Sequence, residues 1–306
     1  MSLVELSGLV AALCWTITSL MAPKLLIEFG SFRFNTVRIS MASITLIAIT
    51  VLTQTVDATI WRHTNALILS GLVGIFIGDT FLFNAMSRLG PRRTGVLFAT
   101  NAPMAIIFAW IVFDETLSVI ELFGCALVTF GAMIAILYGR RKNQLDNVKA
   151  ARLEETKGSL AIGVCMALIA AFCQVSGAIL SKPALLDGTN PITASAIRVS
   201  AAALALIAAY VIYSKRHPIQ ATKLHLISLS SYLQVFIIAI IGMVIGMSVL
   251  VWGIGYGNIG IVTTLSATVP VLVLPAIWIV TGQRPALGAW IGAILVVIGA
   301  GLIVLY

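Results

Sequence analysis

The chain has 306 residues, of which 60% are hydrophobic and 10% are charged, and its mean hydropathy is +1.07. Soluble domains carry about 25% charged residues, so this composition excludes a soluble globular domain and indicates an integral membrane protein. In a soluble protein the formal net charge of +8 could indicate a nucleic-acid partner, but in a membrane protein the question is which side of the membrane carries it. We therefore expect no nucleic acid as a partner.

Ten runs of mostly apolar residues are long enough to cross a bilayer as helices. A hydrocarbon core of about 30 Å requires roughly 20 helical residues at about 1.5 Å each, and no run has the strict alternation of a barrel strand. The predicted fold class is thus an all-α membrane protein with ten transmembrane helices. These helices are expected at residues 4–22, 35–54, 66–86, 95–113, 118–138, 159–180, 192–213, 229–252, 261–280 and 287–305.

The first run, within MSLVELSGLVAALCW, lacks a positive amino-terminal region and carries Glu5 before its apolar residues. These features favour a permanent helix over a cleaved signal peptide. All four cysteines lie inside expected helices without a CxxC pair, and all three histidines lie in expected loops, so we expect no disulfide framework, no metal site and no cofactor. These residues are Cys14, Cys125, Cys165, Cys173, His63, His217 and His225.

The third run contains an acidic residue, Asp79, within GIFIGDTFLFNAMS at residues 74–87. Asp79 lies about 20 Å along the helix axis from residue 66, and an aspartate at the centre of a membrane helix costs about 2.5 to 3.5 kcal/mol. Three interpretations remain open. Asp79 is a proton carrier, because burial favours its neutral form, or a counter-ion for a substrate amine or cation, or a structural partner of Arg38, Arg198 or Asn84.

Glycines flank this acid at a spacing that permits close helix contact. Gly74 and Gly78 form a GxxxG pattern, and Gly242 and Gly246 form another within the eighth run. Small residues four apart let two helix backbones approach in lipid. We interpret both pairs as packing residues.

Two prolines lie within expected helices. Pro103 in the fourth run and Pro270 in the ninth each remove a backbone hydrogen bond, which suits a hinge or a static kink equally well. Asp114 and Glu115 precede the fifth run, where acids complement the helix dipole, so we interpret them as caps. Arg38 and Arg198 lie near helix starts, where snorkelling or carbonyl contact is the ordinary role.

Other polar and aromatic side chains at membrane depth are candidates for a pocket around Asp79, because binding sites combine apolar walls with a few polar groups. Asn101, Gln174 and Trp15 are the strongest of these, since amides need partners in lipid and Trp15 lies too deep for an interfacial belt. The candidates for substrate or proton binding are Asp79, Trp15, Asn84, Asn101, Gln174, Trp252, Tyr256 and Thr268.

The basic residues are concentrated on one side of the predicted membrane topology. Sixteen of the 19 Lys and Arg residues lie in or beside the loops after helices 1, 3, 5, 7 and 9, whereas Arg62, Lys182 and Arg198 lie opposite. The positive-inside rule places the odd-numbered loops, including the charged linker 140–157, in the cytoplasm and both termini outside. We expect a bacterial inner (plasma) membrane.

The two halves of the sequence match each other in order. A shift of 158 places Trp15 on Cys173 and Lys24 on Lys182, and Arg38 falls on Arg198 after a two-residue insertion. Further along, a shift of 168 places both GxxxG glycines, Gly124 and Gly131 on glycines of the second half, and Pro103 meets Pro270 at 167. Asp79 falls on Met247, so the shared scaffold does not require an acid there.

This internal match indicates a duplication of a five-helix unit. Because five is odd, the copies enter the membrane from opposite sides and form an inverted pair, a common plan of secondary transporters. We expect repeats at 1–139 and 158–306, joined by the linker 140–157.

Several motifs resemble a known family. An Arg opens the second helix of each half (NTVRIS, SAIRVS), a Pro lies in the fourth (TNAPM, ATVPV), and FDETL precedes the fifth. In this order they resemble the EamA-type transporters of the drug/metabolite transporter (DMT) superfamily. The resemblance implies a ten-helix inverted-repeat carrier with a central cavity for small metabolites or drugs, often an exporter. The second half departs from the pattern, with Gln283 where the first half has Glu115.

The predicted function is secondary active transport by alternating access, as a proton-coupled exporter of small amino-group-bearing metabolites or organic cations. The alternatives are a uniporter or exchanger of neutral or zwitterionic metabolites and, less favoured, a non-transporting scaffold. GxxxxGK[ST] does not occur, and a hydrolase would need a nucleophile with a base, so we expect no ATP-driven transport and no enzyme. The expected partners are a small-molecule substrate and the bilayer, with a monomer as the simplest assembly.

Overall fold

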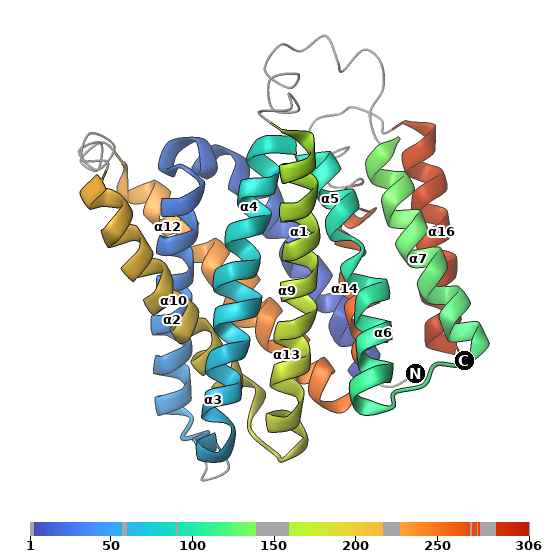
Figure 1. The fold of residues 1–306 in the computed structure, drawn as a ribbon, viewed down its shortest axis with the longest axis horizontal. Coiled ribbons are helices and arrows are strands. Elements are labelled where there is room, and N and C mark those ends of the chain that lie inside the picture. The colour runs from blue at the N-terminus through green and yellow to red at the C-terminus, as the bar shows by residue number, and fades with distance from the viewer. Residues whose placement is uncertain are drawn as a thin grey trace.

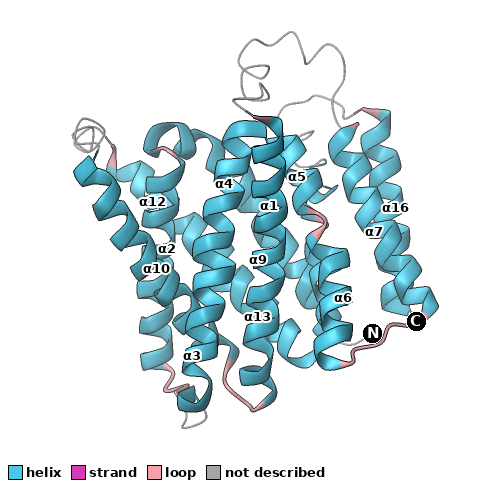
Figure 2. Cartoon of the chain, in the orientation of Figure 1, coloured by secondary structure: helices cyan, strands magenta, loops and turns pink. Residues whose placement is uncertain are grey.

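The structure is a computed structural model that describes residues 3–56, 60–89, 91–138, 159–216, 227–269, 271–273, 275 and 286–305. Every regular element among these residues is a helix (Figure 2). This agrees with the predicted all-α class, because lipid leaves the backbone no other partners along a single span.

The first half contains helices at all five of its predicted crossings, and two of these crossings are interrupted. The third crossing is expected at 66–86 but already begins at Ile60, and it includes a π-helical segment. The fourth is broken at Ala99 and Thr100, which adopt a turn. The elements are α1 (Leu3–Phe29), α2 (Ser31–Leu52), α3 (Ile60–Ser70), η1 (Gly71–Ile77), α4 (Gly78–Leu89), α5 (Pro91–Phe98), α6 (Asn101–Phe113) and α7 (Val119–Leu137).

The second half follows the same plan as far as it is described. Its elements are α9 (Leu160–Leu186), α10 (Pro191–Arg216), α12 (Leu229–Ile238), η4 (Ala239–Gly246), α13 (Met247–Tyr256), α14 (Ile259–Ser266) and α16 (Leu287–Leu305). Among the described residues, eight helices are long and apolar enough to span a membrane, and Leu6–Ala22 and Ile259–Val273 are shorter apolar helices. The predicted two-repeat layout therefore fits, with eight helices of spanning length among the described residues.

The duplication is visible in the irregular backbone as well as in the sequence. The π-helical segments Gly71–Ile77 and Ala239–Gly246 begin 168 residues apart, which is the shift that aligns the glycines. The turn at 99–100 and the turn at 267–268 are separated by the same shift. Both copies of the sequence thus produce the same two interruptions at the same places.

The halves also pack on each other with exchanged partners. A Cβ added to Gly124 would lie 2.8 Å from the Gly299 carbonyl oxygen, and one on Gly131 would lie 2.8 Å from that of Gly292. Gly124 corresponds to Gly292 in the repeat, and Gly131 to Gly299. Each of the two first-half glycines therefore contacts the repeat counterpart of the other, and this exchange is the pattern that a two-fold axis through the interface produces. The contact between α7 and α16 is therefore the contact expected for an inverted pair.

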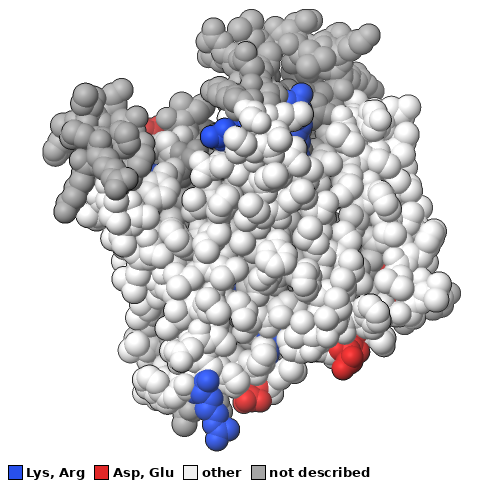
Figure 3. Space-filling view, viewed as in Figure 1, with Lys and Arg blue, Asp and Glu red and all other residues white. Residues whose placement is uncertain are grey.

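The remaining contacts follow this symmetry. Helix α2 packs on α10, the third crossing packs on α9, and the eighth crossing (α12, η4, α13) packs on α1 (Figure 1). Both chain ends lie at one end of the bundle, here called the terminal face (Figure 1). The opposite end, where α7 ends and α9 begins, is called the linker face. On the face drawn in Figure 3, the exposed charged side chains lie mainly at these two ends, with a broad, largely uncharged belt between them.

Candidate functional site

A cavity of about 330 Å³ lies between the two halves, lined by residues of α1, α2, α4, α5, α6, η4, α9, α13 and α14. Its wall is mainly aromatic and aliphatic, with a few polar groups, which is the usual composition of a small-molecule site. The large apolar lining residues include Trp15, Phe83, Met86, Phe98, Met243 and Met247. The polar ones are Arg38, Asp79, Thr94, Asn101, Gln174, Thr263 and Ser266.

The Asp79 carboxylate is paired with Arg38. Its Oδ2 accepts a hydrogen bond of 2.9 Å from Arg38 Nη2, and the same nitrogen donates to Asn35 Oδ1 at 2.8 Å. The side chains of Arg38 and Asp79 keep 14% and 19% of their surface exposed, so neither charge is sealed from the cavity. The Phe83 ring lies beneath the guanidinium, 5.8 Å from Cζ to the ring centroid.

The position of Asp79 follows from the local backbone. It is the second residue of α4, directly after the π-helical segment. A π-helical turn is wider than an α-turn and rotates the side chains that follow it, and such segments are frequent at functional sites. The equivalent residue after η4 is Met247, which also lines the cavity. The equivalent positions of the two repeats therefore place Asp79 and Met247 in the wall of the same cavity.

Arg38 lines the cavity, although we did not include it among the candidates for substrate or proton binding. The sequence left two interpretations of Arg38 open, a snorkelling or carbonyl-binding residue and a structural partner of Asp79. The structure shows the second, because the Arg38 guanidinium binds Asp79. The signal for it was charge matching between a single acid and an arginine on consecutive membrane helices. Its repeat partner Arg198 is buried, and Arg198 Nε and Nη1 have no hydrogen-bond partner within the described part of the chain.

Three further candidates line the cavity together with Asp79. Trp15 Nε1 donates to the Gly242 carbonyl oxygen at 3.0 Å, which holds the indole against η4. Asn101 is buried at the start of α6, and its Oδ1 has no partner in the described residues. Gln174 lines the cavity from α9.

The other four candidates do not line the cavity. Asn84 is exposed and donates to Thr80 O of its own helix at 2.8 Å. Trp252 lines a separate pocket with Leu46 and Ser248, and exposed Tyr256 lies beside it with ring centroids 6.0 Å apart. Thr268 lies in the turn after α14, where its hydroxyl donates to Leu265 O at 2.8 Å. Helix rotation, which the sequence pattern left open, separates these residues from the first four.

The GxxxG glycines lie at helix contacts. A Cβ on Gly74 would be 3.1 Å from Gly177 Cα, and one on Gly78 would be 3.4 Å from Cys173 Cβ, so this pair faces α9. Gly242 faces Thr18 at 3.1 Å and Gly246 faces Cys14 at 3.0 Å, so the second pair faces α1. These close approaches hold the third and eighth crossings beside the cavity.

The fourth crossing is interrupted before its proline. Thr100 is the N-cap of α6 and Pro103 is the third residue of that helix. Backbone N–H groups in the first turn have no partner within their helix, so Pro103 removes no intrahelical bond. The interruption therefore lies at Ala99 and Thr100. Pro270 lies outside the described residues.

The interpretation of Asp114 and Glu115 as caps of the fifth helix is wrong. Ser118 is the N-cap of α7 and forms a capping box with Glu121. Asp114 instead ends α6 in a left-handed conformation, with φ 53°. The Glu115 carboxylate binds Lys182, 67 residues away in the sequence. In the part of the chain that is described, no three His, Cys, Asp or Glu residues are placed to hold a metal ion.

Two matched helical halves around a central, partly polar cavity define a membrane carrier of the inverted-repeat class. The sequence matches the EamA-like transporter family over residues 2–137 and 161–305, so the chain belongs to this family of DMT-superfamily membrane transporters. A solved crystal structure shares the fold, with a TM-score of 0.75 at 17% identity over 98% of this chain and 95% of the other. No curated protein matches the sequence.

Proposed function

We propose that this transporter is a proton-coupled exporter of small amino-group-bearing metabolites or organic cations, which it moves through the central cavity by alternating access. The observation that carries this proposal is the Asp79 carboxylate in the cavity wall, held 2.9 Å from Arg38. A carboxylate can be neutralised by the guanidinium, by a substrate cation or by a proton, and these states exclude one another.

This exclusion supplies a coupling mechanism. A substrate ammonium that binds Asp79 displaces Arg38, which keeps Asn35 Oδ1 as an acceptor. A proton on Asp79 removes the charge that attracts the substrate, so protonation on one side favours substrate release there. Exchange of one proton for one cation across the membrane follows from a single shared carboxylate.

The cavity suits a small amphipathic ligand. Its volume of about 330 Å³ is at the lower end of the range of about 300 to 1,000 Å³ for small-molecule sites. Aromatic faces such as those of Trp15 and Phe83 attract cations, and Met243 and Met247 provide an adaptable apolar wall. These properties favour an amine or cation that carries an apolar group.

The direction of transport is inferred from the charged ends. The positive-inside rule assigns the linker face to the cytoplasm. The cavity lining reaches Met86 and Thr94, close to the junction of α4 and α5 at that face. A cavity that extends toward the cytoplasm is suited to collecting substrate for export.

A second candidate is a uniporter or exchanger of zwitterionic metabolites. The same ion pair favours it, because Asp79 offers a partner to an ammonium group and Arg38 offers one to a carboxylate. A scaffold without transport is less favoured, since it does not require a cavity that touches both charges.

The proposal is tested by flux in proteoliposomes with an imposed pH gradient. The probes are tetraethylammonium, an organic cation that does not readily cross lipid unaided, and leucine as a zwitterion. We expect gradient-driven cation flux in the wild type and its loss in Asp79→Asn. Unchanged flux in Asp79→Asn contradicts the coupling role. Leucine flux without dependence on the gradient, lost in both Asp79→Asn and Arg38→Gln, supports the second candidate instead.

A further inference from the structure

We propose that Lys182 and Glu115 form a gate that closes the cavity at the terminal face, and that the chain rests with this gate shut because the corresponding residues of the repeat, Lys24 and Gln283, do not reproduce the ion pair. The inference rests on the proposed transport function, because a gate has meaning only where a cavity opens alternately to two sides.

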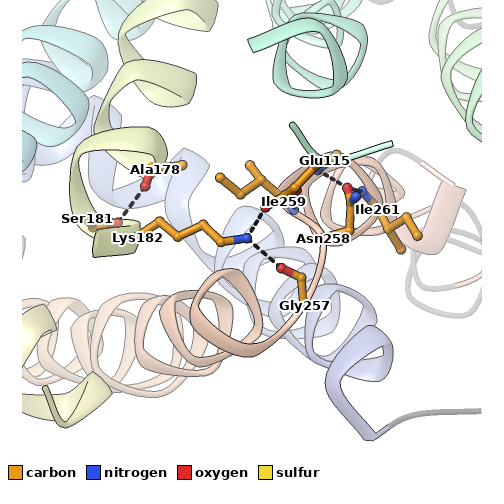
Figure 4. A network of polar contacts seen from close by, with 9 residues as sticks. Glu115, Ala178, Ser181, Lys182, Gly257, Asn258, Ile259 and Ile261 are labelled. Carbon is orange, nitrogen blue, oxygen red and sulfur yellow. Dashed lines mark hydrogen bonds and ion pairs between the residues drawn. The ribbon is translucent and has the colours of Figure 1, made fainter. Parts of the chain in front are cut away.

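The gate connects four segments of the bundle (Figure 4). Lys182 Nζ, on α9, forms an ion pair with the Glu115 carboxylate and donates to the Gly257 carbonyl oxygen at 2.9 Å. Glu115 Oε2 accepts the backbone N–H of Ile259 at 2.9 Å, at the first residue of α14. The Phe113 ring covers the ammonium, with 5.5 Å from Nζ to the ring centroid. The connection after α6 is thus joined to the ends of α9, α13 and α14.

This cluster is the layer directly beyond the cavity on three helices. Toward the terminal face, the lining residue Ala178 is followed by Lys182, four positions away, and Ile254 is followed by Gly257, three positions away. In the same direction, Thr263 is followed by Ile259, four positions away. At about 1.5 Å per residue, these separations are about 4.5 to 6 Å.

Both charged side chains are shielded, with 7% of Lys182 and 13% of Glu115 exposed. A buried ion pair is stable while both partners are in place, and each charge needs water once they separate. Separation is therefore favourable only when the terminal face opens far enough to hydrate both charges. The pair consequently favours a fully shut or a fully open face over intermediate states.

The repeat does not reproduce this ion pair. Lys182 corresponds to Lys24 and Glu115 corresponds to Gln283, so the corresponding positions of the sequence hold a cation and a neutral amide. Lys24 is exposed on α1, whereas Lys182 is buried. The two residues that correspond to Lys182 and Glu115 therefore cannot form an ion pair with each other. The conformation with the terminal face shut, and the cavity extending toward the linker face, is the resting state.

The test measures accessibility and needs no substrate. Ser266→Cys places a thiol in the cavity wall, and a membrane-impermeant maleimide is applied from either face in oriented vesicles. Mass spectrometry quantifies labelling at position 266 separately from the native cysteines. In the parent protein we expect labelling from the linker face to exceed that from the terminal face at least tenfold.

Glu115→Gln is expected to raise terminal-face labelling at least fivefold, and Gln283→Glu is expected to lower linker-face labelling by a similar factor. Asp187→Asn is the matched control, because Asp187 lies near the same face and its Oδ2 is 2.7 Å from His63 Nε2, but its side chain is 55% exposed. We expect no change in this control.

Unchanged labelling in both Glu115→Gln and Gln283→Glu overturns the gate, as does an equal effect of Asp187→Asn. If Glu115→Gln fails to fold, Gln283→Glu decides, because it removes no existing contact of the gate. If the wild type shows no gradient-driven cation flux but the gate variants change labelling as expected, the proposed function is rejected and the gate is kept. If the wild type shows that flux but labelling is unchanged in the gate variants, the gate is rejected and the proposed function is kept.

Discussion

The ion pair between Asp79 and Arg38 permits a quantitative test in the double-mutant cycle of Asp79→Asn, Arg38→Gln and the double variant. Removing one partner of a buried pair costs about 3 to 5 kcal/mol. Here the side chains keep 19% and 14% of their surface exposed, and Arg38 retains Asn35 as an acceptor. We therefore expect a smaller loss of unfolding free energy, about 2 kcal/mol, for each single variant.

In the double variant no charge is left without a partner, so its loss of stability should be less than the sum of the two single losses by about 1 to 2 kcal/mol. The assay is equilibrium unfolding in mixed detergent micelles, followed by tryptophan fluorescence. Asp187→Asn serves as the control for an exposed contact and should change stability by less than about 0.5 kcal/mol. Additivity of the two single variants within about 0.5 kcal/mol refutes the reasoning.

Two further predictions concern the repeat. Gly131→Ala should destabilise the contact between α7 and α16 by about 1 to 3 kcal/mol, because the new Cβ would lie 2.8 Å from a backbone oxygen. Gly301→Ala is the control, because a Cβ at this position would have no atom within 4 Å. It should be neutral or slightly stabilising in the same unfolding assay. Met247→Asp should be tolerated better than Met243→Asp in yield and thermal stability, because it restores the acid that Arg198 lacks; equal losses in the two variants contradict this pairing.

The helical fold and its duplication were predictable because each depends on local pattern. Apolar runs of about 20 residues become helices wherever lipid offers the backbone no partner. The repeated glycines were found by sequence matching, and the same shift reappears in the π-helical segments Gly71–Ile77 and Ala239–Gly246. The π-helical geometry itself was not predictable, since it depends on how both crossings pack against their neighbours.

The lining of the candidate cavity was predictable only in part. Asp79, Trp15, Asn101 and Gln174 line the cavity, and Asn84, Trp252, Tyr256 and Thr268 do not. Depth in the membrane selected all eight, but depth says nothing about the direction in which a side chain points. Asn84 is five residues beyond Asp79 and faces away from the cavity. Five residues turn a helix by about 500°, which is one full turn and about 140° more, so the two side chains point in different directions.

The sequence by itself determined that this is a duplicated helical membrane protein with one acid deep in the third crossing, since hydropathy and repeat register are properties of the chain. Only the tertiary structure decided the partners of the charges. Asp79 meets Arg38 across 41 residues, and Glu115 meets Lys182 across 67. Both pairings depend on how the helices rotate and pack. That arrangement minimises unpaired charge and empty space over the whole bundle, which no local pattern records.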